Sequence, residues 1–200
     1  SEVFFTAGAK TSSSEEAYSR LRRAASFFPA DYHLMNAGKR CLLFYDETLS
    51  PHWLDRGGYF FEKLIKRNPR CALALNGAGV LNREKSVLYK DTKYALKAER
   101  FFEKAIENDP YLKAAHFNLA RLLEKQGKLH EAANQYGEAL EIYKNDELML
   151  FNAGVVNVNA GKPSAALGFW YRLREINPEY KKLRRYIKRA EELAVDARRK

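Results

Sequence analysis

The sequence contains few of the residues that cross-link a chain or interrupt its helices. Only two cysteines, Cys41 and Cys71, occur among 200 residues, so a disulfide framework does not hold the fold together. Six prolines and 11 glycines are too few for a loop-rich protein. No apolar run approaches the roughly 20 residues that cross a bilayer, so no transmembrane helix is predicted. With 46% hydrophobic and 30% charged residues, the composition is that of a folded protein.

Residues that carry chemistry are also sparse. The four histidines, His33, His52, His116 and His130, lack a second ligand-type residue at a spacing typical of a metal site. Gly77-Ala78-Gly79 lies inside a helical pattern rather than after a strand, so it does not indicate a phosphate-binding loop. No nucleophile can be paired with a base from spacing alone. The sequence therefore predicts no catalytic residue, metal, cofactor or small-molecule substrate, and a protein that is not an enzyme.

Positive charge is concentrated at the C-terminal end. The formal net charge is +10, and the last 20 residues hold nine Lys and Arg against three Asp and Glu. The candidate basic patch consists of Lys181, Lys182, Arg184, Arg185, Lys188 and Arg189. Such a patch fits an acidic partner, a membrane surface or nucleic acid, but it is also what the solvated face of a terminal helix looks like.

A short motif recurs along the chain. It is an Asn followed by small or apolar residues, and it begins at Asn36, Asn76, Asn118 and Asn152. Pro110 and Pro178 lie 68 residues apart, which is two periods of 34. A fixed period of this length indicates a repeat protein.

Two units, 113–146 and 147–180, show the repeat at full length. Small residues occupy positions 8 and 20 of each unit, and an aromatic residue occupies position 24. These residues are Ala120, Ala132 and Tyr136 in the first unit and Gly154, Ala166 and Trp170 in the second. The pattern resembles the tetratricopeptide repeat family, in which small residues at positions 8 and 20 let the two helices of a hairpin approach closely.

This resemblance covers about residues 13–180. Units 31–70 and 71–112 fit if seven and eight extra residues are placed between their helices, and segment 13–30 fits a second helix alone. Residues 1–12 are expected to be a flexible segment, and 181–200 a basic amphipathic helix that caps the array. The resemblance thus implies an all-α, right-handed solenoid of antiparallel helical hairpins with about ten helices and no strand.

Local signals refine the expected helix boundaries. Ser13 and Glu16 form a capping box, and a helix is expected to start at Ser50-Pro51 and another at Pro163. The apolar residues of segment 85–90 fall in a connection that should be polar. We expect them to form a second contact surface or, as we favour, to fold back onto helix 51–67.

The two cysteines are expected to remain free thiols. They fall ten positions apart on neighbouring first helices, which corresponds to about 15 Å along parallel axes. A disulfide requires Cα atoms within about 7 Å. One of the two thiols should be buried.

The family resemblance also implies a binding surface on the first helix of each hairpin. Carried onto this sequence, it comprises Tyr32, Met35, Asn36, Lys39, Leu75, Asn76, Arg83, Phe117, Asn118, Arg121, Lys125, Phe151, Asn152, Val155 and Asn159. Apolar residues lie at its two ends and basic residues in the middle, which suits a protein segment with apolar anchors and one or two carboxylates. The alternative is that several of these residues pack against a neighbouring hairpin. The recurring Asn amides either bind a peptide backbone or form hydrogen bonds between hairpins.

The expected function is that of a non-enzymatic scaffold that binds another protein or peptide. RNA binding through the C-terminal helix is the alternative from another class, although the stacking aromatics typical of RNA-binding repeats are missing. Self-assembly into a homo-oligomer is a third. Free thiols suit a reducing cytoplasm, whereas a chain that starts with Ser1 leaves open a processed periplasmic or cell-envelope protein.

Overall fold

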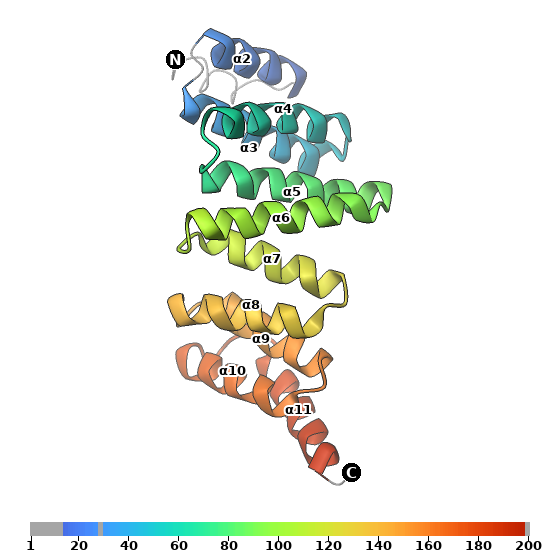
Figure 1. The fold of residues 1–200 in the computed structure, drawn as a ribbon. Helices are drawn as coiled ribbons and strands as arrows, with labels where there is room; N and C mark the ends of the chain where they lie inside the picture. Colours follow the sequence, from blue (N-terminus) through green and yellow to red (C-terminus); the bar gives the residue numbers. More distant parts are fainter. Residues whose placement is uncertain (1–13, 28–29, 199–200) are drawn as a thin grey trace. The chain divides into compact units, whose positions relative to one another are not determined.

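The computed structural model describes residues 14–27 and 30–198. Ten α-helices and no strand occur in these two ranges, which confirms the all-α fold predicted from the repeats (Figure 1). The chain divides into two compact units, Ser1–Leu112 and Lys113–Lys200. The expected segment 1–12, Ser13 of the capping box and Pro29 lie outside the described residues.

Successive helices pair into hairpins. The helices of the first unit are α2 (Ser14–Phe27), α3 (Asp31–Thr48), α4 (His52–Arg67), α5 (Ala72–Tyr89) and α6 (Thr92–Asn108). Those of the second unit are α7 (Lys113–Lys125), α8 (Leu129–Ile142), α9 (Glu147–Asn159), α10 (Pro163–Ile176) and α11 (Leu183–Arg198). The hairpins are α3/α4, α5/α6, α7/α8 and α9/α10, with α2 packed on α3 and α11 packed on α10. None of the described helices combines the length and apolar character needed to span a membrane.

Turn residues explain where the helices of the second unit begin and end. Gly127 and Gly161 follow α7 and α9 with φ of 77° and 74°, a conformation that glycine adopts without a steric penalty. Asp146 caps α9 by accepting a hydrogen bond of 2.9 Å from the Met149 N–H. Pro163 occupies the first turn of α10, as predicted.

The extra residues of the first unit lengthen its helices rather than its loops. Helices α3 and α5 each have 18 residues, whereas α7 and α9 each have 13. The expected connection at 85–90 is therefore wrong, because residues up to Tyr89 continue α5 and do not fold back. Val87 and Tyr89 are exposed on its last turns. Each lengthened first helix ends at a non-glycine residue with positive φ, Leu49 in α3 and Lys90 in α5.

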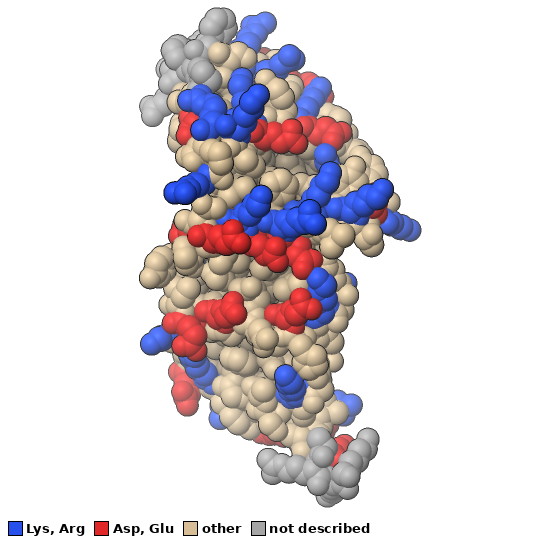
Figure 2. Space-filling model, viewed as in Figure 1, with Lys and Arg blue, Asp and Glu red and all other residues tan. Residues whose placement is uncertain are grey.

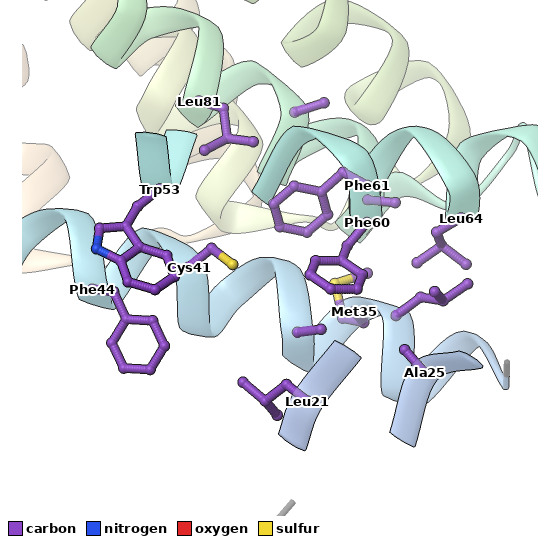
Figure 3. Close-up of a cluster of buried hydrophobic side chains, with 14 of the residues drawn as sticks. Leu21, Ala25, Met35, Cys41, Phe44, Trp53, Phe60, Phe61, Leu64 and Leu81 are labelled. Carbon is purple, nitrogen blue, oxygen red and sulfur yellow. The ribbon is translucent and has the colours of Figure 1, made fainter. Parts of the chain in front are cut away.

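Phe61 of α4 lies at the centre of the first unit's core (Figure 3). A Cβ atom on Gly38 would lie 2.7 Å from its ring, and one on Gly77 would lie 2.5 Å from it. Phe61 therefore packs against both its own hairpin and the next one, which requires glycine on both sides. Helix α2 adds Leu21 and Ala17 to the same core.

Trp170 of α10 plays the corresponding part in the second unit. Its ring packs against Gly154 of α9, where a side chain would overlap the indole. Helix α11 buries one face, which consists of Leu183, Ile187, Ala190 and Ala194. It packs on α10.

Lys and Arg side chains are unevenly spread over the face drawn in Figure 2. They gather where α4 and α6 lie in Figure 1, with a row of Asp and Glu side chains along the edge of this group.

Candidate partner-binding surfaces

Helix α3 presents part of the surface expected for it. Tyr32 is 63% exposed and Lys39 is exposed, with Asn36 half-buried one turn from each. Met35 is only 8% exposed and belongs to the hydrophobic core. The prediction that Met35 lies on a binding surface is therefore wrong, because its side chain packs in the core of the unit.

Helix α5 is rotated relative to the expected register. The residue that packs on the aromatic ring of its own hairpin is Gly79, where a Cβ would lie 2.5 Å from the Phe102 ring, and not Ala78. Gly79 thus corresponds to Gly38 and Gly154 in the other hairpins. A shift of one residue turns a helix by about 100°, since one turn contains 3.6 residues.

The shifted register changes which side chains of α5 reach solvent. Leu75 is 2% exposed and its predicted surface position is wrong, whereas Leu73 is 47% exposed. Asn76 and Arg83 are half-buried. Arg83 donates two hydrogen bonds to the Glu84 carboxylate, at 3.0 and 2.8 Å. Its charge is therefore already balanced within the helix.

Helix α7 carries the most complete set of predicted surface residues. The Arg121 guanidinium lies 5.7 Å from the centre of the half-buried Phe117 ring. Lys125 is exposed one turn further, and Asn118 is half-buried beside Phe117. Together Phe117, Asn118, Arg121 and Lys125 form what we call the α7 surface.

A buried hydroxyl lies beneath the α7 surface. Tyr136 of α8 makes an edge contact with Phe117, with ring centres 6.2 Å apart. Its side chain is fully buried, and its hydroxyl has no hydrogen-bond partner among the described residues. Burial raises the pKa of Tyr136, and the Glu124 carboxylate raises it further while Arg121 lowers it.

Helix α9 has its predicted surface partly covered by its own unit. The Phe151 ring lies 5.3 Å from the Tyr180 ring and 5.0 Å from the Tyr186 ring, so the chain that leads into α11 packs over it. Val155 is half-buried and Asn159 is exposed. Of the two roles that the sequence left open for these residues, Phe151 therefore has the second: it packs within its own unit and is not free for a partner.

The Asn152 amide was expected either to bind a peptide backbone or to form a hydrogen bond between hairpins, and its observed hydrogen bond is of neither kind. Its Nδ2 donates a hydrogen bond of 2.8 Å to the Leu148 carbonyl, four residues earlier in the same helix. Asn82 and Asn157 make the same kind of bond to Ala78 and Ala153. One donor of each amide therefore satisfies its own helix.

The basic patch is on the solvent side of the chain around the start of α11. All six of its residues, Lys181, Lys182, Arg184, Arg185, Lys188 and Arg189, are exposed. Arg189 Nη1 lies 3.3 Å from Glu192 Oε2, one turn further along the helix. Because Glu192 balances the charge of Arg189, the remaining positive charge of the patch lies between residues 181 and 188.

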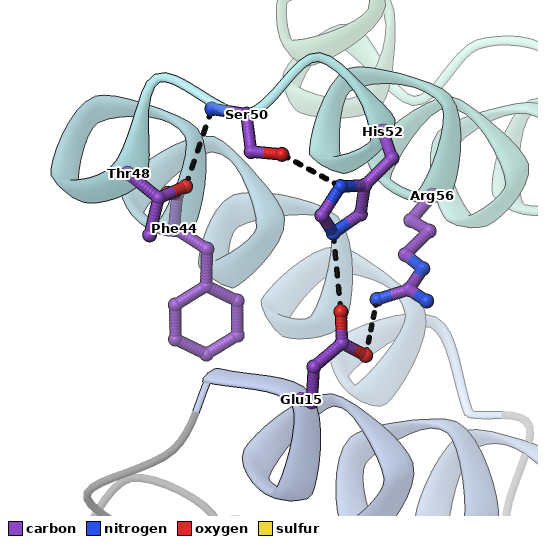
Figure 4. Close-up of polar contacts among 6 residues, drawn as sticks. All are labelled: Glu15, Phe44, Thr48, Ser50, His52 and Arg56. Atoms are coloured by element: carbon purple, nitrogen blue, oxygen red, sulfur yellow. Dashed lines mark hydrogen bonds and ion pairs between the residues drawn. The ribbon is translucent and has the colours of Figure 1, made fainter.

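Sequence spacing did not reveal a polar cluster between α2 and α4 (Figure 4). Glu15 Oε2 accepts a hydrogen bond of 2.7 Å from Arg56, and Glu15 Oε1 lies 3.2 Å from His52 Nε2. The other ring nitrogen, His52 Nδ1, is 2.8 Å from Ser50 Oγ. The Ser50 hydroxyl therefore contacts His52 and caps no backbone N–H of α4, although the Ser50 carbonyl accepts a hydrogen bond from the Trp53 N–H and α4 starts where the Ser-Pro pair predicts.

This Ser-His-Glu set differs from a nucleophilic triad in its geometry. In the serine-protease arrangement the nucleophile contacts Nε2 and the carboxylate contacts Nδ1, the reverse of what Ser50 and Glu15 do here. The Arg56 guanidinium also lies 4.3 Å from the Tyr18 ring centre. The cluster thus joins α2 to α4 by ion pairing and stacking.

Both cysteines are free thiols, as predicted. Cys41 is fully buried and Cys71 is partly exposed. Burial raises the pKa of Cys41 to about 12, and the charge of Arg56 acts in the opposite direction. Within the described ranges, no three His, Cys, Asp or Glu residues are grouped so that they could hold a metal ion.

Comparisons with known proteins agree with the repeat pattern. Family profiles described as tetratricopeptide repeat match residues 84–111 and 101–133. The human protein O-mannosyl-transferase TMTC3 is 31% identical over 85 residues, which are 42% of this chain and 9% of that protein. The similarity to this relative therefore covers only a small part of its length.

Several solved structures share the fold. MamA from Desulfovibrio magneticus RS-1 has a TM-score of 0.68 and 17% identity, covering 90% of this chain and 96% of that one. TTC0263, a thermophilic TPR protein from Thermus thermophilus, has a TM-score of 0.66 and 15% identity, covering 94% and 97%. YrrB, described as a TPR protein with an unusual peptide-binding site, has a TM-score of 0.60 and 20% identity, covering 88% and 91%. At these identities the similarity shows the fold alone.

Proposed function

Since this chain is a tetratricopeptide-repeat protein, we propose that it is a non-catalytic scaffold whose first helices bind a segment of another protein. Tetratricopeptide repeats generally mediate contacts between proteins, and proteins built from them are generally scaffolds without catalytic activity. YrrB, which has the same fold, is described by its peptide-binding site. We therefore propose peptide binding as the class of function of this chain.

The α7 surface is the observation that carries the proposal. It combines an apolar ring, an amide and two cations on adjacent turns of one helix, with Arg121 held over Phe117. An apolar side chain of the partner would contact Phe117, while a carboxylate would pair with Arg121 or Lys125. The amide of Asn118 would add a hydrogen bond to the partner's backbone.

The first unit offers a related surface on α3 and α5. Tyr32 supplies an exposed aromatic ring and Lys39 a cation on α3. On α5 the exposed Leu73 and the half-buried Asn76 take the places that the sequence assigned one residue away. A partner with apolar anchors separated by a carboxylate suits this arrangement as well.

The α9 surface is expected to contribute less. Phe151 is already in contact with Tyr180 and Tyr186, so a ligand would gain little apolar contact there unless the segment before α11 moved. Val155 and Asn159 remain at the surface further along the helix. We therefore place the main anchor of the second unit on α7.

Selection from a random peptide library tests the proposal. The selected peptides are expected to combine apolar residues with Asp or Glu, and to bind more weakly at high salt because exposed charges are screened. The double variant Arg121→Glu, Lys125→Glu should lose binding, since both side chains are exposed and the fold does not depend on them. A matched variant on α8, Glu131→Lys, Glu138→Lys, should bind normally. If the selected peptides bound the Arg121→Glu, Lys125→Glu variant as tightly as the unmodified protein, the proposal would be contradicted.

RNA binding through the exposed basic patch is the second candidate. Single-stranded RNA should then bind with strong salt dependence, and replacing Arg184, Arg185 and Lys188 should weaken it for every sequence tested. Self-assembly is the third candidate, and sedimentation at several protein concentrations tests it directly.

A further inference from the structure

Helix α6 separates its charges by sign. Its basic residues follow one another at steps of four, three and four, and its acidic residues at steps of four. The basic residues are Lys93, Lys97, Arg100 and Lys104, and the acidic ones are Glu99, Glu103 and Glu107. Residues three and four apart are neighbours on a helix surface, so like charges lie next to each other along two stripes.

Like charges repel along each stripe, although Arg100 and Lys104 each have a glutamate three residues further on, Glu103 and Glu107. Like charges four residues apart destabilise a helix, whereas alternating signs would stabilise it. All four basic side chains are exposed. Among the ion pairs between described residues, none involves Lys97, Arg100 or Lys104, although Lys97 Nζ lies 5.7 Å from the Tyr94 ring centre. Adjacent exposed cations that form no ion pair within their unit are available to pair with the carboxylates of a partner.

A cavity lies directly beside the basic stripe. Its lining residues come from α4, α5 and α6 and are Glu62, Asn82, Lys97, Arg100, Phe101 and Lys104. Its volume is about 290 Å³, at the lower limit of small-molecule pockets and better suited to one or two side chains of a larger partner. Figure 2 shows the concentration of Lys and Arg side chains over this part of the surface.

The floor of the cavity offers both apolar and polar contact. Phe101 is half-buried and packs against the hydrophobic core of the unit, so its ring is held in place. Asn82 uses one amide hydrogen for the Ala78 carbonyl. A partner side chain that enters the cavity would therefore meet a fixed aromatic ring with cations along one wall.

We propose that the cavity between α4 and α6 and the basic stripe form a second docking surface, for an acidic amphipathic helix of a partner protein. The three cations that line the cavity are Lys97, Arg100 and Lys104, and the first and last of them are seven residue steps apart, or about 10 Å along the helix axis. Carboxylates at steps of three and four residues on the partner helix match this spacing, and an apolar residue between them would reach Phe101. Glu62 also lines the cavity and would repel any anion placed on it, so the partner's carboxylates must lie along the α6 cations while its apolar side chain enters the cavity, which suits a helix with both kinds of residue better than a uniform polyanion such as RNA. The surface is separate from the first-helix surfaces and does not depend on the function proposed for them.

A designed peptide tests this surface. It is a 15-residue helical peptide with Glu at steps of three and four and one Leu on the same face, compared by fluorescence anisotropy with a scrambled peptide of equal composition. The designed peptide should bind at least about tenfold more tightly than the scrambled one, since only it aligns three ion pairs and an apolar anchor. Equal binding of the two peptides would overturn the proposal.

Two protein variants on α6 make the test specific. Lys97→Gln, Arg100→Gln, Lys104→Gln should weaken binding of the designed peptide by about tenfold or more, as expected for the loss of three exposed ion pairs. Glu99→Gln, Glu103→Gln, Glu107→Gln removes as many charges from the same helix and should bind at least as well as the unmodified protein. The first variant should unfold at about the same temperature as the unmodified protein, because the repulsion removed along the stripe is offset by the lost attraction to Glu103 and Glu107. If the Lys97→Gln, Arg100→Gln, Lys104→Gln variant lost binding and also unfolded at a lower temperature, its loss of binding would come from a folding defect. The three cations would then not form a docking surface, and the proposal would be overturned.

Other anionic ligands complete the comparison. Oligouridylate RNA and phosphatidylserine vesicles are expected to bind more weakly than the designed peptide. If either binds more tightly and is released by the Lys97→Gln, Arg100→Gln, Lys104→Gln variant, the surface recognises phosphate and not a protein helix. The variant Arg121→Glu, Lys125→Glu should leave binding of the designed peptide unchanged, which separates this surface from the α7 surface.

Discussion

Gly154 of α9 lies directly against the indole ring of Trp170 in α10, whose Nε1 donates a hydrogen bond of 3.1 Å to the Phe151 carbonyl. The same relationship joins Gly38 to Phe61 in the first unit. Position 8 of the repeat is therefore small because the aromatic residue at position 24 of the same hairpin occupies the space that a side chain would need. The hydrogen bond fixes the indole in this place and satisfies its buried donor.

Replacing Gly154 by alanine should destabilise the second unit. The added methyl group overlaps the Trp170 ring, and overpacking of a core costs about 1–3 kcal/mol. Gly168→Ala is the control, because its methyl group meets nothing within 4 Å and alanine is preferred in a helix by about 0.5–1 kcal/mol. Urea unfolding followed by Trp170 fluorescence in a Trp53→Phe background measures both changes. Equal effects of the two substitutions would refute this packing.

Acid should weaken the second unit partly through Asp146. Burial by itself raises the pKa of this carboxyl, but hydrogen bonds from the Met149 N–H and from Lys113 outweigh it and hold the pKa below its ordinary value of 3.8. The carboxylate therefore contributes stability above pH 3.8 that is lost as the pH falls through the folded-state pKa.

Asp146→Asn keeps the capping oxygen but removes the charge. We expect a loss of about 1 kcal/mol or less at pH 6 and a shallower decline in unfolding free energy between pH 5 and about 2 than in the unmodified protein. Urea unfolding across this range makes the comparison, with Asp196→Asn on the exposed end of α11 as the control. Parallel curves for the Asp146 variant and the unmodified protein would contradict the assignment.

The two thiols should differ greatly in reactivity. At pH 8 one thiol per chain should react quickly with a disulfide reagent, and Cys71→Ser should abolish this fast reaction. Cys41 reacts slowly in the native state because it is buried and its pKa is raised to about 12. Urea should expose it. A fast native reaction in the Cys71→Ser variant would show that Cys41 is accessible.

Glu15 should hold α2 on α4. Glu15→Gln removes the ion pair with Arg56 and weakens the contact with His52, and we expect faster amide exchange in α2. The change in global unfolding free energy should be small, about 0–1 kcal/mol, because the groups are exposed. Glu16→Gln, whose partner Arg20 lies within α2, is the control and should leave exchange at the α2–α4 contact unchanged. Equal exchange rates in the two variants would rule out this role.

The repeat period alone predicts most of the fold. Small residues at a fixed spacing indicate that paired helices pack closely, and the contact of Gly154 with Trp170 is an example. The insertions were harder to interpret, because Val87 and Tyr89 looked like loop residues that were too apolar. They extend α5 instead, since nothing in the sequence ends the helix before Lys90 adopts positive φ.

The surface residues were less predictable from the sequence. Gly77-Ala78-Gly79 offers three small residues in a row, and only the contact between Gly79 and Phe102 shows which of them crosses the second helix. The one-residue error that followed placed the buried Leu75 on the surface. The cluster of Glu15 and His52 depends on how α2 docks, which spacing along the chain does not encode.

Photo-crosslinking of a library-selected peptide tests the central claim most directly. A photoreactive group placed beside the peptide's acidic residue should label residues within 113–125, and the label should disappear in the Arg121→Glu, Lys125→Glu variant. Labelling confined to α8, α10 or α11, unchanged in that variant, would contradict the claim that the first helices of the repeats receive the partner.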